Sequence, residues 1–247
     1  MKRKRITWVA FRPDPSTALA AVLVLASILA SWLMTRTDSR FLDHLLRQVL
    51  QVLVISLILP FLLMRRSGDF RSAGIRFDRI WLHLLISLGL AGLLFLQMGS
   101  DIGFDRLGMP HGDKWEGLIY VMVTNIVEVF FFACYLRHAF EKAFGVIAGV
   151  ILAAAAFSLH HAGFQPEFLK LFLVGLFFIT IVRTADHWLI AFPFWWVGGV
   201  MDVLYGSEAT SGVDWTGFAW WALAILAVII VLFAACRGDM KAPAGES

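Results

Sequence analysis

The sequence predicts an all-α integral membrane protein, a polytopic transmembrane bundle of about eight helices. Sixty per cent of the residues are hydrophobic and only 16% are charged, whereas a soluble domain of this size needs more charge to cover its surface. The apolar residues form long runs, and most charged residues stand at the ends of these runs, where a bilayer tolerates them. We therefore expect residues 1–247 to form a single membrane domain.

Eight apolar runs define the expected spans, which are Thr17–Met34, Val49–Met64, Ile80–Met98, Leu118–Leu136, Phe144–Leu159, Phe168–Val182, Trp188–Tyr205 and Trp215–Ala235. Several of them are close to the lower limit of about 17 residues for crossing the hydrocarbon core. Their ends should therefore extend into the flanking polar residues. Pro60 and Pro193 lie inside spans and are expected to kink them.

The amino end is basic, and its first apolar run starts only near Thr17, without a clear small-residue cleavage site. This pattern favours an uncleaved first span over a signal peptide. Basic residues also gather in the second and fourth connections and in the tail, namely Arg65, Arg66, Arg71, Arg76, Arg79, Arg137, Lys142, Arg237 and Lys241. With eight spans, the positive-inside rule places all of these regions and both termini in the cytoplasm. This accounts for the net charge of +3, so we expect membrane lipid as a partner and no nucleic acid.

Glu128 is an ionisable residue inside the fourth run, with Asn125 three residues earlier on the same helical face. A charged group in the bilayer costs a few kcal/mol, so such residues normally face a bundle interior and have a function. A carboxyl group among Phe and Val side chains suits a general base or acid. The alternative is a protonated glutamic acid that hydrogen-bonds to a neighbouring helix.

His160 and His161 follow the fifth run. Adjacent side chains on a helix point about 100° apart, so we expect at most one of these histidines to face a site. The alternative is a pair of histidines at the membrane interface.

Asp202 follows Gly198 and Gly199 near the end of the seventh run. Paired glycines allow a neighbouring helix to approach closely, and an acid beside them can bind a metal or orient a base. The alternative is a polar helix end that reaches the interface.

The order of these residues resembles the CAAX-protease and bacteriocin-processing (CPBP, Abi-type) family of intramembrane metalloproteases. The family's first motif, Glu-Glu-x-x-Phe-Arg-Gly-x-Leu, is matched from Glu128 to Leu136 at the first Glu, the Phe and the Leu, with Val129 and Ala133 in place of the second Glu and the Arg. Its second motif, Phe-x-x-x-His, is matched by Phe157 and His161. Its last motif, His-x-x-x-Asn/Asp, keeps Asp202 but has Gly198 in place of the His. The resemblance covers residues 118–206.

The resemblance implies an endopeptidase that cleaves a membrane-embedded or lipidated protein or peptide in the bacterial inner membrane. Its catalytic residues would be Glu128 as base, His161, and Asp202 as ligand or stabiliser. A divalent metal, zinc, would be held by His161 and Asp202, with His160 adding a second nitrogen if the helix unwinds there. Because the second Glu, the Arg and the last-motif His are missing, a catalytically impaired relative that binds a membrane partner is the main alternative. A transporter is disfavoured because no duplicated pattern of interrupted spans is present.

Overall fold

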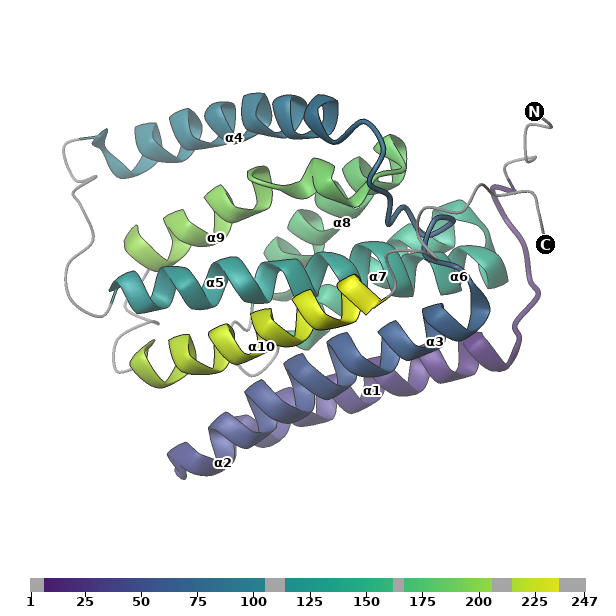
Figure 1. Cartoon of the computed structure of the whole chain (residues 1–247), viewed down its shortest axis with the longest axis horizontal. Coiled ribbons are helices and arrows are strands. Elements are labelled where there is room, and N and C mark those ends of the chain that lie inside the picture. The colour runs from purple at the N-terminus through teal and green to yellow at the C-terminus, as the bar shows by residue number, and fades with distance from the viewer. Residues whose placement is uncertain (1–6, 105–113, 162–166, 206–214, 236–247) are drawn as a thin grey trace. The chain divides into compact units, whose positions relative to one another are not determined.

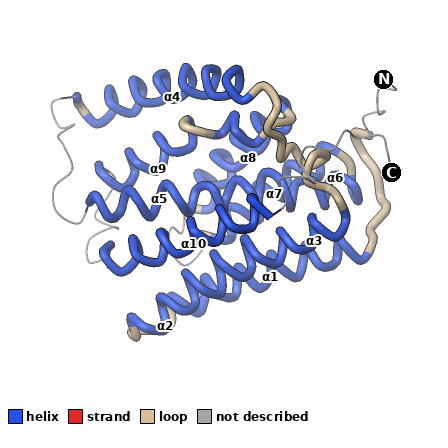
Figure 2. Tube along the Cα trace, viewed as in Figure 1, coloured by secondary structure: helices blue, strands red, loops and turns tan. Residues whose placement is uncertain are grey.

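The computed structural model describes residues 7–104, 114–161, 167–205 and 215–235, and all regular secondary structure among them is helical (Figure 2). Within these described ranges, five helices are long and apolar enough to cross a membrane, and three shorter apolar helices cover 146–160, 188–201 and 219–234. The prediction of an all-α, multi-helical integral membrane protein is therefore confirmed, and the eight apolar segments match the eight predicted runs.

The elements follow the predicted runs in order (Figure 1). They are α1 (Pro15–Met34), α2 (Arg40–His44), η1 (Leu45–Ile58), α3 (Leu59–Ser67), α4 (Ile80–Ile102), α5 (Lys114–Glu128), η3 (Val129–Leu136), α6 (Arg137–Phe144), α7 (Val146–His160), α8 (Phe168–Ala185), η4 (Trp188–Ala191), α9 (Phe194–Tyr205) and α10 (Trp215–Ala235). The second and fourth runs lie inside longer continuous helices, Arg40–Ser67 and Trp115–Phe144. At Pro193 the helix is interrupted between η4 and α9 rather than only kinked. 

Two segments, η1 and η3, have the wider hydrogen-bond ladder of a π-helix. At the end of η1, for example, the Leu59 N–H bonds to the Val54 carbonyl, five residues earlier. Such segments interrupt ordinary helices frequently, though not exclusively, at functional sites. Here η3 starts immediately after Glu128, so this carboxyl group stands where the ladder changes.

The chain divides into two compact units, each made from two stretches of sequence. The first contains Met1–Ile75 and Glu128–Asp186, and the second contains Arg76–Val127 and His187–Ser247. The prediction of one membrane domain stays a prediction.

In the first unit, α1 lies along η1, and α7 packs against both α6 and α8. Membrane helices gain little from the hydrophobic effect against one another, so close approach at small residues is what stabilises them. Gly175 of α8 provides such a contact, since an added Cβ atom would lie 2.7 Å from the Phe157 ring of α7. Phe157 is thereby fixed one turn before the histidines.

A buried ion cluster lies in the same unit, where the sequence predicted a basic connection. Arg137 is 1% exposed and pairs with Glu141 at 3.1 Å, and Glu141 also pairs with Arg183 at 2.8 Å. Arg137 donates further hydrogen bonds to the carbonyls of Ala133 (2.6 Å) and Ala73 (2.7 Å). The fourth span therefore continues through Arg137 as helix, because the charges are paired inside the protein.

In the second unit, α4 packs against α9 and η4. The predicted close approach at the paired glycines is confirmed at Gly199, where an added Cβ atom would lie 2.6 Å from Val121 and 2.8 Å from the Asn125 amide nitrogen. Gly198 has more room, since its nearest neighbour would be a Leu94 methyl group at 3.8 Å.

Candidate functional site

Glu128, His160 and His161 come together in the first unit. Each offers one ligand atom, and these atoms all lie within 4.8 Å of one another. Glu128 is the last residue of α5, and the two histidines stand at the end of α7. The expectation that at most one histidine would face the site is wrong, because α7 ends at His160 and His161 leaves helical geometry with φ −88° and ψ 3°.

The ring of His161 is held in one tautomer. Its Nδ1 atom lies 2.8 Å from the carbonyl oxygen of Phe157. A carbonyl oxygen can only accept a hydrogen bond, so Nδ1 carries the hydrogen and the neutral ring presents a lone pair at Nε2. That Nε2 atom lies 3.5 Å from Glu128 Oε1, which is too long for a direct hydrogen bond. At this distance the ring nitrogen and the carboxylate oxygen are close enough to bind one metal cation together.

The ring of His160 is buried and has polar partners from two other helices. Its Nδ1 lies 2.6 Å from Ser27 Oγ of α1 and 3.2 Å from Gln51 Nε2 of η1. The Gln51 amide also donates to the carbonyls of Ser27 at 3.1 Å and His160 at 3.3 Å. A serine hydroxyl can accept as well as donate. When it accepts from Nδ1–H, His160 Nε2 has a free lone pair, which is the pattern of a metal-binding histidine with an outer-shell partner.

The surroundings of the cluster are aromatic and only partly closed. The Phe132 ring lies 5.1 Å from the His160 ring, and the Phe157 ring lies 4.7 Å from the His161 ring, both edge-on. The side chains of Glu128 and His161 remain 17% and 19% exposed. A small molecule such as water can therefore reach the groups that face each other, while His160 behind them is buried.

Asp202 belongs to α9 (Phe194–Tyr205), but its side chain lies outside the described residues, so its role as ligand or stabiliser stays a prediction. Asn125, expected to share a face with Glu128, donates its amide to the Trp195 carbonyl at 3.4 Å in the second unit. 

Two residues of the site were not predicted from the sequence, Ser27 and Gln51. Both are polar residues inside apolar runs and both are buried, with exposures of 1% and 3%. The only signal in the sequence was a polar residue inside an apolar run, because a polar group within a bilayer needs a hydrogen-bond partner. 

No family model, no curated protein and no solved structure matches this chain. The site is therefore interpreted from its own geometry.

Proposed function

We propose that this protein is a metal-dependent intramembrane endopeptidase similar to the CPBP proteases. The observation that carries the proposal is the convergence of Glu128, His160 and His161 within an apolar helical protein. These are the first-motif Glu, the second-motif His and its neighbour. The resemblance rests on the order of residues in the sequence, whereas their proximity is a property of the fold.

The donor set suits zinc. The imidazole nitrogens of His160 and His161 are ligands of the kind that zinc peptidases combine with a carboxylate oxygen and an open position. The hydrogen bond from His161 Nδ1 to the Phe157 carbonyl and the Ser27 contact of His160 are the outer-shell partners that such ligands usually have. When bound, the metal supplies a Lewis acid that polarises a carbonyl group and lowers the pKa of water. Asp202 is proposed as a further ligand or stabiliser on the family resemblance.

The chain's own residues have separate roles in the proposed reaction. Glu128 takes the proton of a water molecule positioned beside His161, which makes that water a better nucleophile toward a peptide carbonyl. The Phe132 and Phe157 rings limit the water that surrounds these groups, and this strengthens electrostatic interactions within the site. The proposed substrate is a membrane-anchored or lipidated protein or peptide. Both termini are proposed to be cytoplasmic, in the bacterial inner membrane, which is supported by the basic second and fourth connections.

Metal content of the purified, full-length protein tests the ligand set. We expect near-stoichiometric zinc after reconstitution, with large losses in His161→Ala and His160→Ala, and a loss in Asp202→Ala if the family role holds. His138→Ala is the matched control, since this histidine pairs with Asp69 rather than with the cluster. Absence of zinc from the parent protein would refute the metal-dependent mechanism.

Glu128→Gln tests whether the Glu128 carboxylate acts as a base or as a metal ligand. As a base, Glu128 is needed for cleavage of a membrane-anchored reporter but not for zinc binding, so the variant should keep zinc and lose cleavage. As a ligand, it is needed for both. Zinc binding without cleavage in the parent protein would instead support the second candidate, a catalytically impaired relative that binds a membrane partner.

One observation favours this second candidate. Val129, which replaces the second Glu of the family motif, is fully buried, so the motif supplies one carboxylate instead of two. Gly198→His offers a direct test, because it restores the missing last-motif histidine where an added Cβ atom has room. A gain of cleavage in this variant would support an impaired family site, and no gain together with parental cleavage would support the protease.

A further inference from the structure

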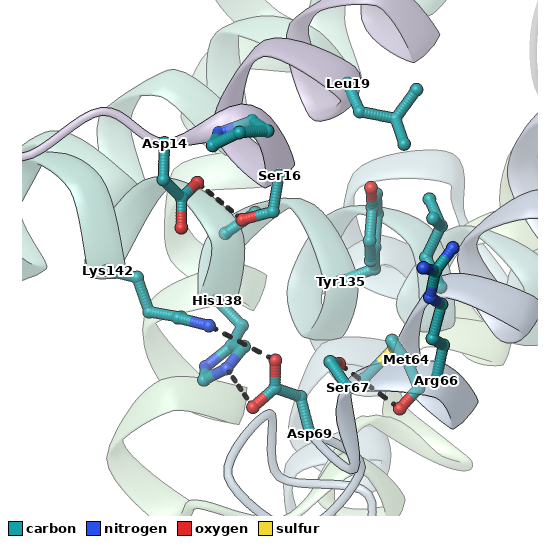
Figure 3. A pocket seen from close by; sticks show the side chains of 13 residues that line it. Asp14, Ser16, Leu19, Met64, Arg66, Ser67, Asp69, Tyr135, His138 and Lys142 are labelled. Carbon is teal, nitrogen blue, oxygen red and sulfur yellow. Dashed lines mark hydrogen bonds and ion pairs between the residues drawn. The ribbon is translucent and has the colours of Figure 1, made fainter.

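A second polar site, separate in its residues from the Glu128 cluster, lies at one end of the first unit. It is a cavity of about 470 Å³ lined by residues of α1, α3, η3, α6 and the segment after α3 (Figure 3). Asp14 and Pro15 are at the start of α1, Arg66 and Ser67 at the end of α3, and Lys142 in the last turn of α6. Because three membrane helices begin or end around it, the cavity lies where the apolar core meets the polar interface.

The two carboxylates of the cavity are ionised. Hydrogen bonding to His138, with smaller contributions from Ser67 and Lys142, holds the pKa of Asp69 well below its usual range. Asp69 is neutralised by Lys142 at 3.3 Å and lies 3.4 Å from His138. Hydrogen bonds from Ser16 and from Thr17 lower the pKa of Asp14 to about 2.

Asp14 keeps an open oxygen. Its Oδ1 atom accepts from the Ser16 hydroxyl at 2.6 Å and from the backbone N–H and hydroxyl of Thr17, both at 2.8 Å. Among the described residues no hydrogen bond reaches Oδ2. A carboxylate has room for about four hydrogen bonds, so this oxygen is available to a cationic donor in the cavity.

Two donors of the cavity have no hydrogen-bond partner in the part of the chain that the structure describes. One is the guanidinium group of Arg66 and the other is the hydroxyl group of Tyr135. Figure 3 shows the Tyr135 ring and the Arg66 side chain on one side of the view, with Asp14 on the other side. A guanidinium and a hydroxyl that line one cavity are a phosphate-binding combination.

The remaining wall is apolar, with Leu19, Leu63 and Met64 as its main side chains. Leu19 is a large hydrophobic residue on an exposed face of α1, so the wall continues from the cavity onto a surface that acyl chains cover in a membrane. A molecule that fills the cavity therefore has a polar, doubly charged end and an apolar continuation.

We propose that this cavity binds the phosphoethanolamine headgroup of a phospholipid, with the phosphate on Arg66 and Tyr135 and the ammonium on Asp14. The charges favour a zwitterion over an anionic lipid, because Arg66 and Lys142 are balanced by two ionised carboxylates. Ethanolamine is favoured over choline because an ammonium group donates hydrogen bonds to a carboxylate. A quaternary amine instead requires several electron-rich rings of Phe, Tyr or Trp, and the lining has Tyr135 alone of these residue types.

Native mass spectrometry of delipidated, full-length protein tests this site. Phosphatidylethanolamine, phosphatidylcholine and phosphatidylglycerol with identical oleoyl chains are titrated separately. We expect one phosphatidylethanolamine to bind at least roughly tenfold more tightly than either other lipid, as expected for a charge-assisted hydrogen bond that only this headgroup forms. Equal binding of the three lipids, or preference for phosphatidylglycerol, would overturn the proposal.

Three variants of the cavity and one control variant outside it locate the lipid. Arg66→Gln should weaken phosphatidylethanolamine binding roughly tenfold, while Arg65→Gln, its exposed neighbour outside the cavity, should not. Asp14→Asn should remove the preference over phosphatidylcholine and leave α1 capped, because asparagine is as good an N-cap as aspartate. Tyr135→Phe removes only the hydroxyl and tests the phosphate contact without changing the fold. Equal effects of the Arg65 and Arg66 variants would show nonspecific attraction and refute the site. 

Discussion

Replacing Ser27 with alanine removes the hydroxyl group that lies 2.6 Å from His160 Nδ1. The remaining polar neighbour of that nitrogen is the Gln51 amide at 3.2 Å, which can only donate a hydrogen bond. A donor at Nδ1 favours the tautomer with its hydrogen on Nε2. In this tautomer His160 has no lone pair left for a metal.

The expected loss follows from this change of tautomer. Removing an outer-shell partner of a metal-binding histidine typically costs 10- to 100-fold in metal affinity, or about 1.4–2.7 kcal/mol. The free energy of unfolding of the metal-free protein should fall by about 1–3 kcal/mol, because a buried hydrogen bond is lost. Zinc affinity is measured by competition with a chelator, and stability by thermal unfolding in detergent.

A second substitution isolates the cause. In the background of Ser27→Ala, Gln51→Leu removes the donor that selects the wrong tautomer, so part of the lost zinc affinity should return. Ser56→Ala is the matched control, since Ser56 is also buried but its hydroxyl has no hydrogen-bond partner among the described residues. If Ser27→Ala and Ser56→Ala bind zinc equally well, His160 is not a ligand oriented by Ser27 and the reasoning fails.

Three further predictions concern packing and charge. Arg137→Met should lower the free energy of unfolding by about 3–5 kcal/mol, because it removes a buried cation that donates to two backbone carbonyls and is one of the two arginines that neutralise the partly buried Glu141. Thermal unfolding against Glu141→Gln and the double variant measures the coupling. Gly199→Ala should cost about 1–3 kcal/mol through overpacking, whereas Gly198→Ala, with room for a Cβ atom, should change the unfolding temperature little. The lowered pKa of Asp69 means that its stabilising effect is present above pH ~4, its unfolded pKa, and is lost as the pH falls toward the folded value. Asp69→Asn should therefore destabilise the protein at pH 7 and have less acid-dependent unfolding than the parent, and an unchanged acid profile would contradict this.

The helices were predictable because hydropathy alone decides which segments enter a bilayer. The last span was expected at Trp215–Ala235 and α10 has the same bounds. The fourth span was expected to end at Leu136 but continues as helix to Phe144. Its continuation contains Arg137 and Glu141, which raise the polarity of the sequence but pair with each other, and Glu141 also pairs with Arg183, which is distant along the chain. Hydropathy counts such charges as exposed, and only the three-dimensional arrangement shows that they are paired.

The candidate site was also predictable only in part. Glu128 and His161 stood out because an ionisable group in a span is costly. Ser27 and Gln51 did not, because neutral polar residues are common in membrane helices and the sequence does not show what they face. Their partner His160 is more than a hundred residues away along the chain. The packing of α1 and η1 beside α7 could not be derived from the periodicity of any one helix.

The end of α7 explains how two adjacent histidines serve one site. Within a continuous helix their side chains would diverge by about 100°. A continuing helix would also use the Phe157 carbonyl for a backbone hydrogen bond from the residue four positions later. Here the His161 backbone N–H bonds instead to Ser158, and the Phe157 carbonyl accepts from the His161 ring. The same departure from helical geometry therefore turns the second ring toward Glu128 and sets its tautomer. Both properties depend on where the helix ends, so the position of that end, as much as the identity of the residues, makes this cluster a candidate metal site.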